Sequence, residues 1–171
     1  NSTVDGQIEL TTDYVPQQGT QHLLLDDSTS GGTKSLNELT LNVDLAMASN
    51  VEVRFWVREW NDEPDVLPLT FTGSFNGDGL AMSNDGMTWH RLVDFTTLTL
   101  NYQQFSIDLD AAVAAANISY TADFYLRFSQ YDDYPAPSDG LLLDDFIVGD
   151  NLPDNFPPTG FDAGTDCDDL D

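Results

Sequence analysis

The sequence contains few basic side chains. Five Lys and Arg residues stand against thirty Asp and Glu residues, for a formal net charge of −25, and Lys34 is the single lysine. Nucleic acids and anionic membrane surfaces are bound through Lys and Arg that neutralise phosphate groups, so this composition excludes nucleic acid as a ready partner. Two interpretations of the acidity remain open. The carboxylates keep the protein soluble in salty surroundings, or some of them bind Ca²⁺.

Cysteine and long apolar runs are also scarce. Cys167 stands alone in the sequence, which excludes an internal disulfide and a cysteine-based zinc site. No apolar run approaches the roughly 18 residues that a membrane-spanning helix needs, so we expect no membrane insertion. The sequence has neither an initiator Met nor a signal-peptide pattern, and we expect it to be an excised or processed segment.

The sequence does contain enough apolar material for a folded core, with 40% hydrophobic and 11% aromatic residues. Short stretches that alternate apolar and polar residues recur along it, separated by Gly, Asn, Asp and Pro. The clearest is VEVRFWVRE, in which Val, Val, Phe and Val point one way and the residues between them the other. We expect strands at 7–10, 22–27, 36–45, 51–59, 79–83, 87–93, 102–109, 124–131 and 140–148.

These strands and one helical stretch indicate an all-β fold. DAAVAAAN at 110–117 is the helical pattern, and we expect Asp110 to cap it. An antiparallel β-sandwich with jelly-roll topology and one short helix fits this arrangement best. We expect the sandwich to span residues 1–149. Residues 150–171, rich in Asp and Pro, are then an acidic linker or tail that leads to other modules of the same chain.

Five segments between residues 15 and 148 occur in an order that is typical of one group of domains. They are QGTQHLLLDDS, VEVRFWVREW, SNDGMTWHRL, FYLRFSQYDD and SDGLLLDDFIV. This order resembles the MAM-type and related galactose-binding-like jelly rolls. The sequence differs from MAM domains in lacking their disulfide cysteines and in its acidic insert between Trp60 and Leu80. The resemblance implies an extracellular module of a larger secreted bacterial or marine protein, with a binding or adhesion role.

The motif LLLDD occurs twice, at 23–27 and at 141–145. Three leucines indicate a buried strand, and a carboxylate that follows it is costly to bury unless it is paired. In the resembled family the first and last strands lie close together, and a structural cation commonly uses an Asp of the last strand with backbone carbonyls near an early Gly. We therefore expect the two aspartate pairs to meet around Ca²⁺, which cancels their repulsion. The resemblance nominates Asp144 and the carbonyls of Gln18 and Gly19 as ligands, and position adds Asp26.

An alternative interpretation of the same aspartates needs no cation. In it, Asp144 and Asp145 accept hydrogen bonds from the amides of a loop. The sequence leaves both arrangements open.

Three loops are dense in oxygen-bearing side chains, at 59–65, 75–79 and 130–139. If they gather at one rim, they can hold a second Ca²⁺, with Asp78 and Asp132 as ligands, and present aromatic rings to a sugar. The alternative is that Asp, Asn, Gly and Pro simply form turns here. Trp56, on the polar side of its strand, belongs either to a ligand-binding face or under a second layer. The candidate sugar-binding residues are Trp56, Trp60, Asp62, Tyr131 and Tyr134.

Motifs of catalysis are missing from the sequence. There is no G-x-S-x-G, H-E-x-x-H or phosphate-binding loop. SNDGMTW at 83–89 is one residue shorter than an Asp-box, and we interpret it as a hairpin turn with Trp89 packed beneath. A glycosidase needs only two carboxylates, so a carbohydrate-active enzyme stays an alternative.

The combined prediction is a secreted or cell-surface module that is not itself an enzyme, binds Ca²⁺, and recognises polysaccharide or a cell-surface glycan. A MAM-like adhesion or protein-interaction module is the second hypothesis. An accessory domain of a carbohydrate-active enzyme or protease is the third.

Overall fold

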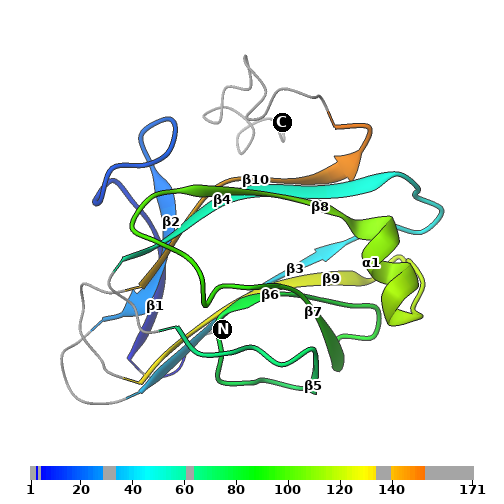
Figure 1. The fold of residues 1–171 in the computed structure, drawn as a ribbon, viewed down its shortest axis with the longest axis horizontal. Coiled ribbons are helices and arrows are strands. Elements are labelled where there is room, and N and C mark those ends of the chain that lie inside the picture. Colours follow the sequence, from blue (N-terminus) through cyan, green and yellow to red (C-terminus); the bar gives the residue numbers. More distant parts are fainter. Residues whose placement is uncertain (1–2, 4, 29–33, 61–63, 134–139, 153–171) are drawn as a thin grey trace, which may run out of the picture.

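The computed structural model describes residues 3, 5–28, 34–60, 64–133 and 140–152. In these residues the chain forms two five-stranded antiparallel sheets that face each other, with one short helix (Figure 1). The first sheet has the order β1 (Gly6–Thr11), β2 (His22–Asp27), β10 (Gly140–Asp150), β4 (Val51–Trp60) and β8 (Gln103–Asp108). The second has the order β3 (Ser35–Val43), β9 (Phe124–Asp132), β6 (Gly79–Ser83), β7 (Thr88–Asp94) and β5 (Thr70–Thr72).

The path of the chain is that of a jelly roll. The chain alternates between the sheets: β2, β4, β8 and β10 lie in the first sheet, and β3 and β9 lie in the second. The strands β5, β6 and β7, which follow β4, all lie in the second sheet. Strands remote in sequence are therefore neighbours in space, such as β2 with β10 and β3 with β9. The predicted antiparallel β-sandwich with one short helix is confirmed. Among the described residues, no helix is long and apolar enough to span a membrane.

The core lies between the sheets and follows the alternation seen in the sequence. Val51, Val53, Phe55 and Val57 of β4 are at most 2% exposed, because every second side chain of the strand points inward. The Phe55 ring packs against three other phenylalanine rings at centroid distances of 5.2 to 6.2 Å. Each fully buried side chain of this kind contributes about 1.5–3 kcal/mol of transfer free energy.

The helix α1 (Leu109–Ala116) begins earlier than predicted. Its N-cap is Asp108, whose side chain accepts a hydrogen bond from the Ala111 amide at 2.9 Å, so the prediction that Asp110 caps the helix is wrong. The fully buried Leu109 draws the start of the helix toward the core. Asp110 instead accepts hydrogen bonds from the Asn50 amide and the Tyr120 hydroxyl, tying the helix to the start of β4.

The turn between β6 and β7 has the hairpin structure expected of SNDGMTW. Asp85 accepts hydrogen bonds from the Met87 and Thr88 amides at 2.8 and 2.7 Å, and these bonds lower the pKa of Asp85 to about 2. Trp89 is 1% exposed, and the Arg127 guanidinium lies 3.7 Å from its ring centroid. The turn is therefore a folding device with Trp89 beneath it.

The two LLLDD motifs pair with each other, in opposite directions. Leu23, Leu24 and Leu25 of β2 lie opposite Leu143, Leu142 and Leu141 of β10. Because the strands are antiparallel, Asp26–Asp27 lies at one end of this leucine patch and Asp144–Asp145 at the other, about 13 Å apart along the strands. The predicted meeting of four carboxylates is wrong, and so is Asp26 as a ligand in the Asp144 site.

The last strand ends at Asp150, one residue beyond the predicted end of the domain. Residues 153–171, most of the predicted tail, lie outside the described residues, as do the candidate sugar-binding residues Asp62 and Tyr134.

Candidate functional site

The outer face of the first sheet holds an aromatic strip along β4. Trp56 and Trp60 are four residues apart, so both side chains leave the strand on the side away from the core, about 13 Å apart. Both are half-buried, and Arg58 lies between them. Two tyrosines from neighbouring loops complete what we call the aromatic face, which consists of Tyr14, Trp56, Arg58, Trp60 and Tyr102.

Arg58 holds the aromatic face together. It is only 8% exposed, and its guanidinium carbon lies 5.1 Å from the Trp60 ring centroid and 4.7 Å from that of Tyr102. Its Nη atoms donate to the backbone carbonyls of Tyr14, Val15 and Leu100. Ring faces and carbonyl dipoles thus compensate a cation that has lost most of its water, and Arg58 anchors two loops against the sheet.

The loop between β1 and β2 crosses the aromatic face. Its Tyr14 ring lies 5.1 Å from the Trp60 ring, and its Gln17 and Gln18 amides donate to Asp144 Oδ2 at 2.8 and 3.1 Å. Tyr14, Val15 and Gly19 all have positive φ, which gives the loop its tight course. The loop therefore covers part of the sheet between β2 and β4.

Asp144 thus meets the loop at Gln18, next to Gly19, where the family resemblance led us to expect a cation. The contact consists of two backbone N–H donors, which is the alternative arrangement of the sequence analysis. Among the described residues, no group of three or more His, Cys, Asp or Glu side chains is placed to hold a metal. Ca²⁺ at Asp144 with the carbonyls of Gln18 and Gly19 stays a prediction.

Polar atoms with no hydrogen-bond partner border the aromatic face. Within the described part of the chain these buried atoms are His22 Nε2, Trp56 Nε1 and Arg58 Nε. The other nitrogen of His22 lies 2.5 Å from the Tyr102 hydroxyl. Burial lowers the pKa of His22 and raises the pKa of Tyr102 to about 12, so both side chains are neutral at pH 7. The contact between the buried His22 and Tyr102 holds the segment before β8 against the start of β2.

The three oxygen-rich loops gather at one end of the sandwich, as far as they are described. The buried Asp78 carboxylate joins them, because its two oxygens accept the amides of Asp65 and Tyr131. Burial raises the pKa of Asp78 to about 7. Asp132 is also buried, on the inner face of β9 opposite Ser35.

Trp60 and Tyr131 lie on opposite sides of this end. Trp60 is on the outer face of the first sheet. Tyr131 lies three positions after the core residue Phe128 on β9, so its side chain leaves the opposite face, which is the outer face of the second sheet. The prediction that these two rings present one shared platform is therefore corrected. The aromatic face of the first sheet replaces it, with Tyr14 and Tyr102 in place of Tyr131.

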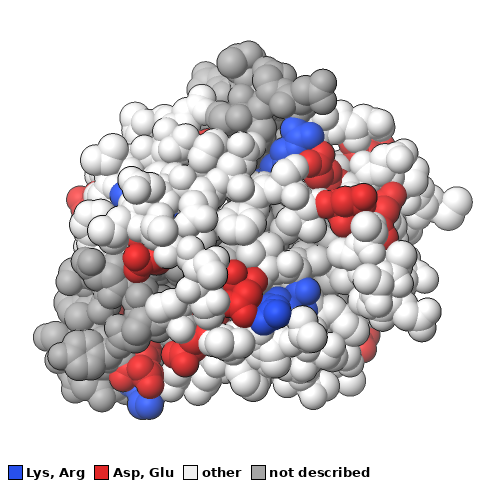
Figure 2. Space-filling view, viewed as in Figure 1, with Lys and Arg blue, Asp and Glu red and all other residues white. Residues whose placement is uncertain are grey.

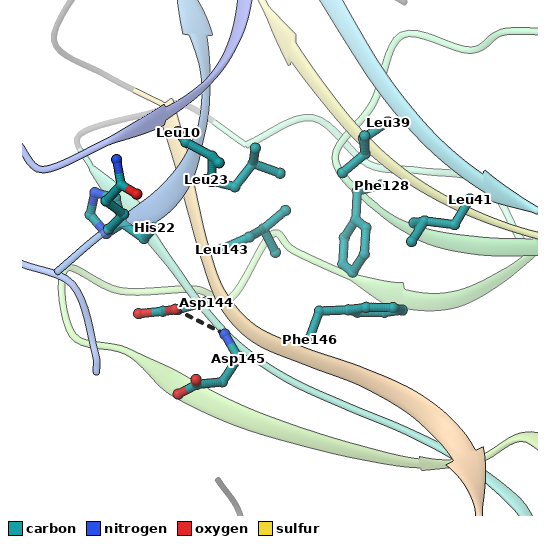
Figure 3. A pocket seen from close by; sticks show the side chains of 11 residues that line it. Leu10, His22, Leu23, Leu39, Leu41, Phe128, Leu143, Asp144, Asp145 and Phe146 are labelled. Atoms are coloured by element: carbon teal, nitrogen blue, oxygen red, sulfur yellow. Dashed lines mark hydrogen bonds between the residues drawn. The ribbon is translucent and has the colours of Figure 1, made fainter. Parts of the chain in front are cut away.

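A separate pocket of about 270 Å³ opens between the two sheets beside β10 (Figure 3). Leu39, Phe128, Leu143 and Phe146 give it an apolar lining, with Asp144 and Asp145 at one end. It forms where β2 stops at His22 while β10 continues past an irregularity at 144–147. Burial, with the Asp144 charge, raises the pKa of Asp145 to about 6. Such a lining offers sugar hydroxyls few partners.

The remaining basic groups are engaged in ion pairs. Lys34 pairs with Asp133, Arg54 with Glu52, Arg91 with Asp94 and Arg127 with Glu38, at nitrogen–oxygen distances of 2.5 to 3.4 Å. Figure 2 shows basic groups next to acidic ones, and further acidic groups elsewhere on the same face. The described surface is therefore unsuited to polyanions.

The comparisons with known proteins assign the chain to no family. No family model matches the sequence, and no curated protein matches it. Among solved structures, the CBM22-1 xylan-binding domain of Xyn10C from Paenibacillus barcinonensis is similar, with a TM-score of 0.47 and 15% sequence identity. The match covers 86% of this chain and 83% of that one. The MAM-like resemblance stays a prediction.

Proposed function

We propose that this chain is a non-catalytic carbohydrate-binding module of a secreted or cell-surface protein, and that it binds neutral polysaccharide on the aromatic face. The observation that supports this most is the pair Trp56 and Trp60 on one side of β4, with Arg58 between them and its guanidinium over the Trp60 ring. Sugar rings stack their apolar C–H faces on indoles, and a small number of polar groups fixes their orientation.

The charge of the chain bears on the kind of glycan. Trp56 Nε1 and His22 Nε2 lack hydrogen-bond partners in the described structure, but both atoms are buried, so they are not counted as sugar contacts. A net charge of −25 repels uronate-rich or sulfated chains. We therefore favour neutral glycans as ligands.

Affinity electrophoresis against a panel of neutral and anionic polysaccharides tests the proposal. We expect neutral chains to retard the wild type, and Trp56→Ala and Trp60→Ala each to weaken retardation at least tenfold, which corresponds to about 1.4 kcal/mol of binding free energy. Phe75→Ala is the matched control, because Phe75 is 40% exposed and packs against Phe71 of the second sheet.

Three results would contradict the proposal. Full retardation of both Trp variants places the site elsewhere. No retardation of the wild type by any glycan favours the protein-interaction hypothesis, and release of reducing sugar from a glycan shows an enzyme. Each measurement is made with and without EDTA, so that dependence on Ca²⁺ is read separately.

A further inference from the structure

Polar side chains replace apolar ones at one end of the space between the sheets. The alternation of side chains places Asp27 on the inner face of β2, after Leu23 and Leu25. Four further polar side chains lie on the inner faces of β3 and β9. All are at most 1% exposed. This inner polar cluster consists of Asp27, Ser35, Asn37, Gln130 and Asp132.

Asn37 joins the two sheets within the cluster. Its Nδ2 donates to the Asp26 carbonyl at 2.9 Å and to Gln130 Oε1 at 2.8 Å. Because the Asp26 carbonyl can only accept, the amide nitrogen of Asn37 must lie on that side, and its Oδ1 points elsewhere. This oxygen is buried and has no hydrogen-bond partner among the described residues.

The Ser35 hydroxyl is a second buried oxygen without a hydrogen-bond partner among the described residues. Ser35 lies directly opposite Asp132 in the β3–β9 pairing, which places the two side chains next to each other. Asn37 is two residues further along the same face, and its bond to the Asp26 carbonyl brings it beside Asp27. The two oxygens thus belong to the same buried polar end of the sandwich as the carboxylates of Asp27 and Asp132.

The composition of the cluster points to a hard cation. Its candidate donors are carboxylate, amide and hydroxyl oxygens, with no imidazole or thiolate among the described residues of the cluster. Oxygen-only sites suit Ca²⁺, which tolerates irregular geometry, better than Zn²⁺, which prefers nitrogen and sulfur, or Mg²⁺, which keeps several waters.

We propose that the inner polar cluster binds Ca²⁺ through the Asp27 and Asp132 carboxylates, Asn37 Oδ1 and Ser35 Oγ. The ion joins β2 of the first sheet to β3 and β9 of the second. Asp26 takes part through its carbonyl bond to Asn37, and Asp78 stays outside, because both its oxygens accept amides. This structural role is separate from glycan binding on the outer face.

Calorimetric titration of the chain with CaCl₂, together with thermal unfolding in Ca²⁺ and in EDTA, tests the site. We expect a tight component near one ion per chain and a melting temperature several degrees higher in Ca²⁺, since a ligand that binds the native state stabilises it. Asp132→Asn and Ser35→Ala are each expected to weaken the tight component, Asp132→Asn at least tenfold. Asp144→Asn separates this site from the calcium site predicted at Asp144, and it is expected to keep the tight component if the inner polar cluster holds the ion.

Several results would overturn the site. One is a wild type whose melting temperature and titration heat do not respond to Ca²⁺, which means that water alone fills the cluster. Another is a tight component lost in Asp144→Asn and kept in Ser35→Ala. Ser35→Ala removes one hydroxyl and keeps the carboxylates, so it still tests the site if Asp132→Asn does not fold. Glycan retardation in EDTA reports on the proposed function independently.

Discussion

Arg58→Met is expected to lower the free energy of unfolding by about 3 kcal/mol and to abolish most glycan affinity. Methionine keeps the apolar stem of the side chain but leaves the carbonyls of Tyr14, Val15 and Leu100 without their donor. Each carbonyl left buried and unpaired costs about 1–3 kcal/mol, although the loops will relax and recover part of that. The β1–β2 loop then loses its hold on Trp60, and the aromatic face loses its shape.

Arg54→Met is the matched control for Arg58→Met. Arg54 lies on the same face of the same strand, and its ion pair with Glu52 is at 2.6 Å. Partly exposed pairs of this kind contribute about 0–1 kcal/mol. Urea unfolding measures both variants, and affinity electrophoresis measures their glycan binding. If Arg58→Met is as stable and as well retarded as Arg54→Met, Arg58 does not organise the site.

Asp78 is expected to make the protein less stable as the pH rises from 5 to 8. Burial raises the pKa of this carboxyl from 3.8 to about 7 in the folded state. The unfolded chain loses the proton near pH 4, and the folded chain keeps it until about pH 7. The stabilising effect of the protonated form is thus complete below pH 4 and is lost as the pH passes through 7. The change between pH 5 and 8 is roughly 2 kcal/mol.

Urea unfolding in EDTA across this pH range measures the effect, with Asp78→Asn as the comparison. Asparagine keeps one acceptor for the Asp65 and Tyr131 amides and does not titrate, so the variant is less stable at pH 5 but has a flatter pH profile. Glu9→Gln serves as a control, since Glu9 is an exposed carboxylate on β1 of the first sheet. A wild-type profile as flat as that of Asp78→Asn would show that the Asp78 carboxylate is ionised throughout.

The strands were predictable because the alternation of apolar and polar residues, which buries one face of a strand, involves only residues that are close in sequence. VEVRFWVRE became β4 with the predicted face inward, and 22–27 and 79–83 became β2 and β6 without a change of boundary. The three-residue β5 was missed because TFT at 70–72 is too short to show a period. In the predicted strand 36–45, Leu36 is out of step with Leu39 and Leu41. The reason is that Ser35 and Asn37, both polar, take the inward positions at that end of β3.

The site was less predictable because its contacts join distant segments. Trp56 and Trp60 could be placed on one face by parity, and the same parity places Arg58 between them. Tyr14 and Tyr102 come from loops whose course depends on Arg58, and no local pattern signals them. The resemblance indicated that Asp144 meets the early loop, but whether N–H groups or carbonyls face it depends on loop dihedrals that sequence alone does not give.

The antiparallel pairing of the two LLLDD motifs also protects the alignment of β2 on β10. If β2 slid by two residues so that Leu25 faced Leu143, Asp27 would come to lie opposite Leu141, in the apolar interior. Asp27 is already buried, but among polar side chains, and the slide would move its carboxylate among leucines, which offer no hydrogen-bond donors. The aspartates at the two ends of the leucine segments thus fix the register of β2 on β10. They also disfavour pairing of these apolar segments with strands of other molecules while the chain is still folding.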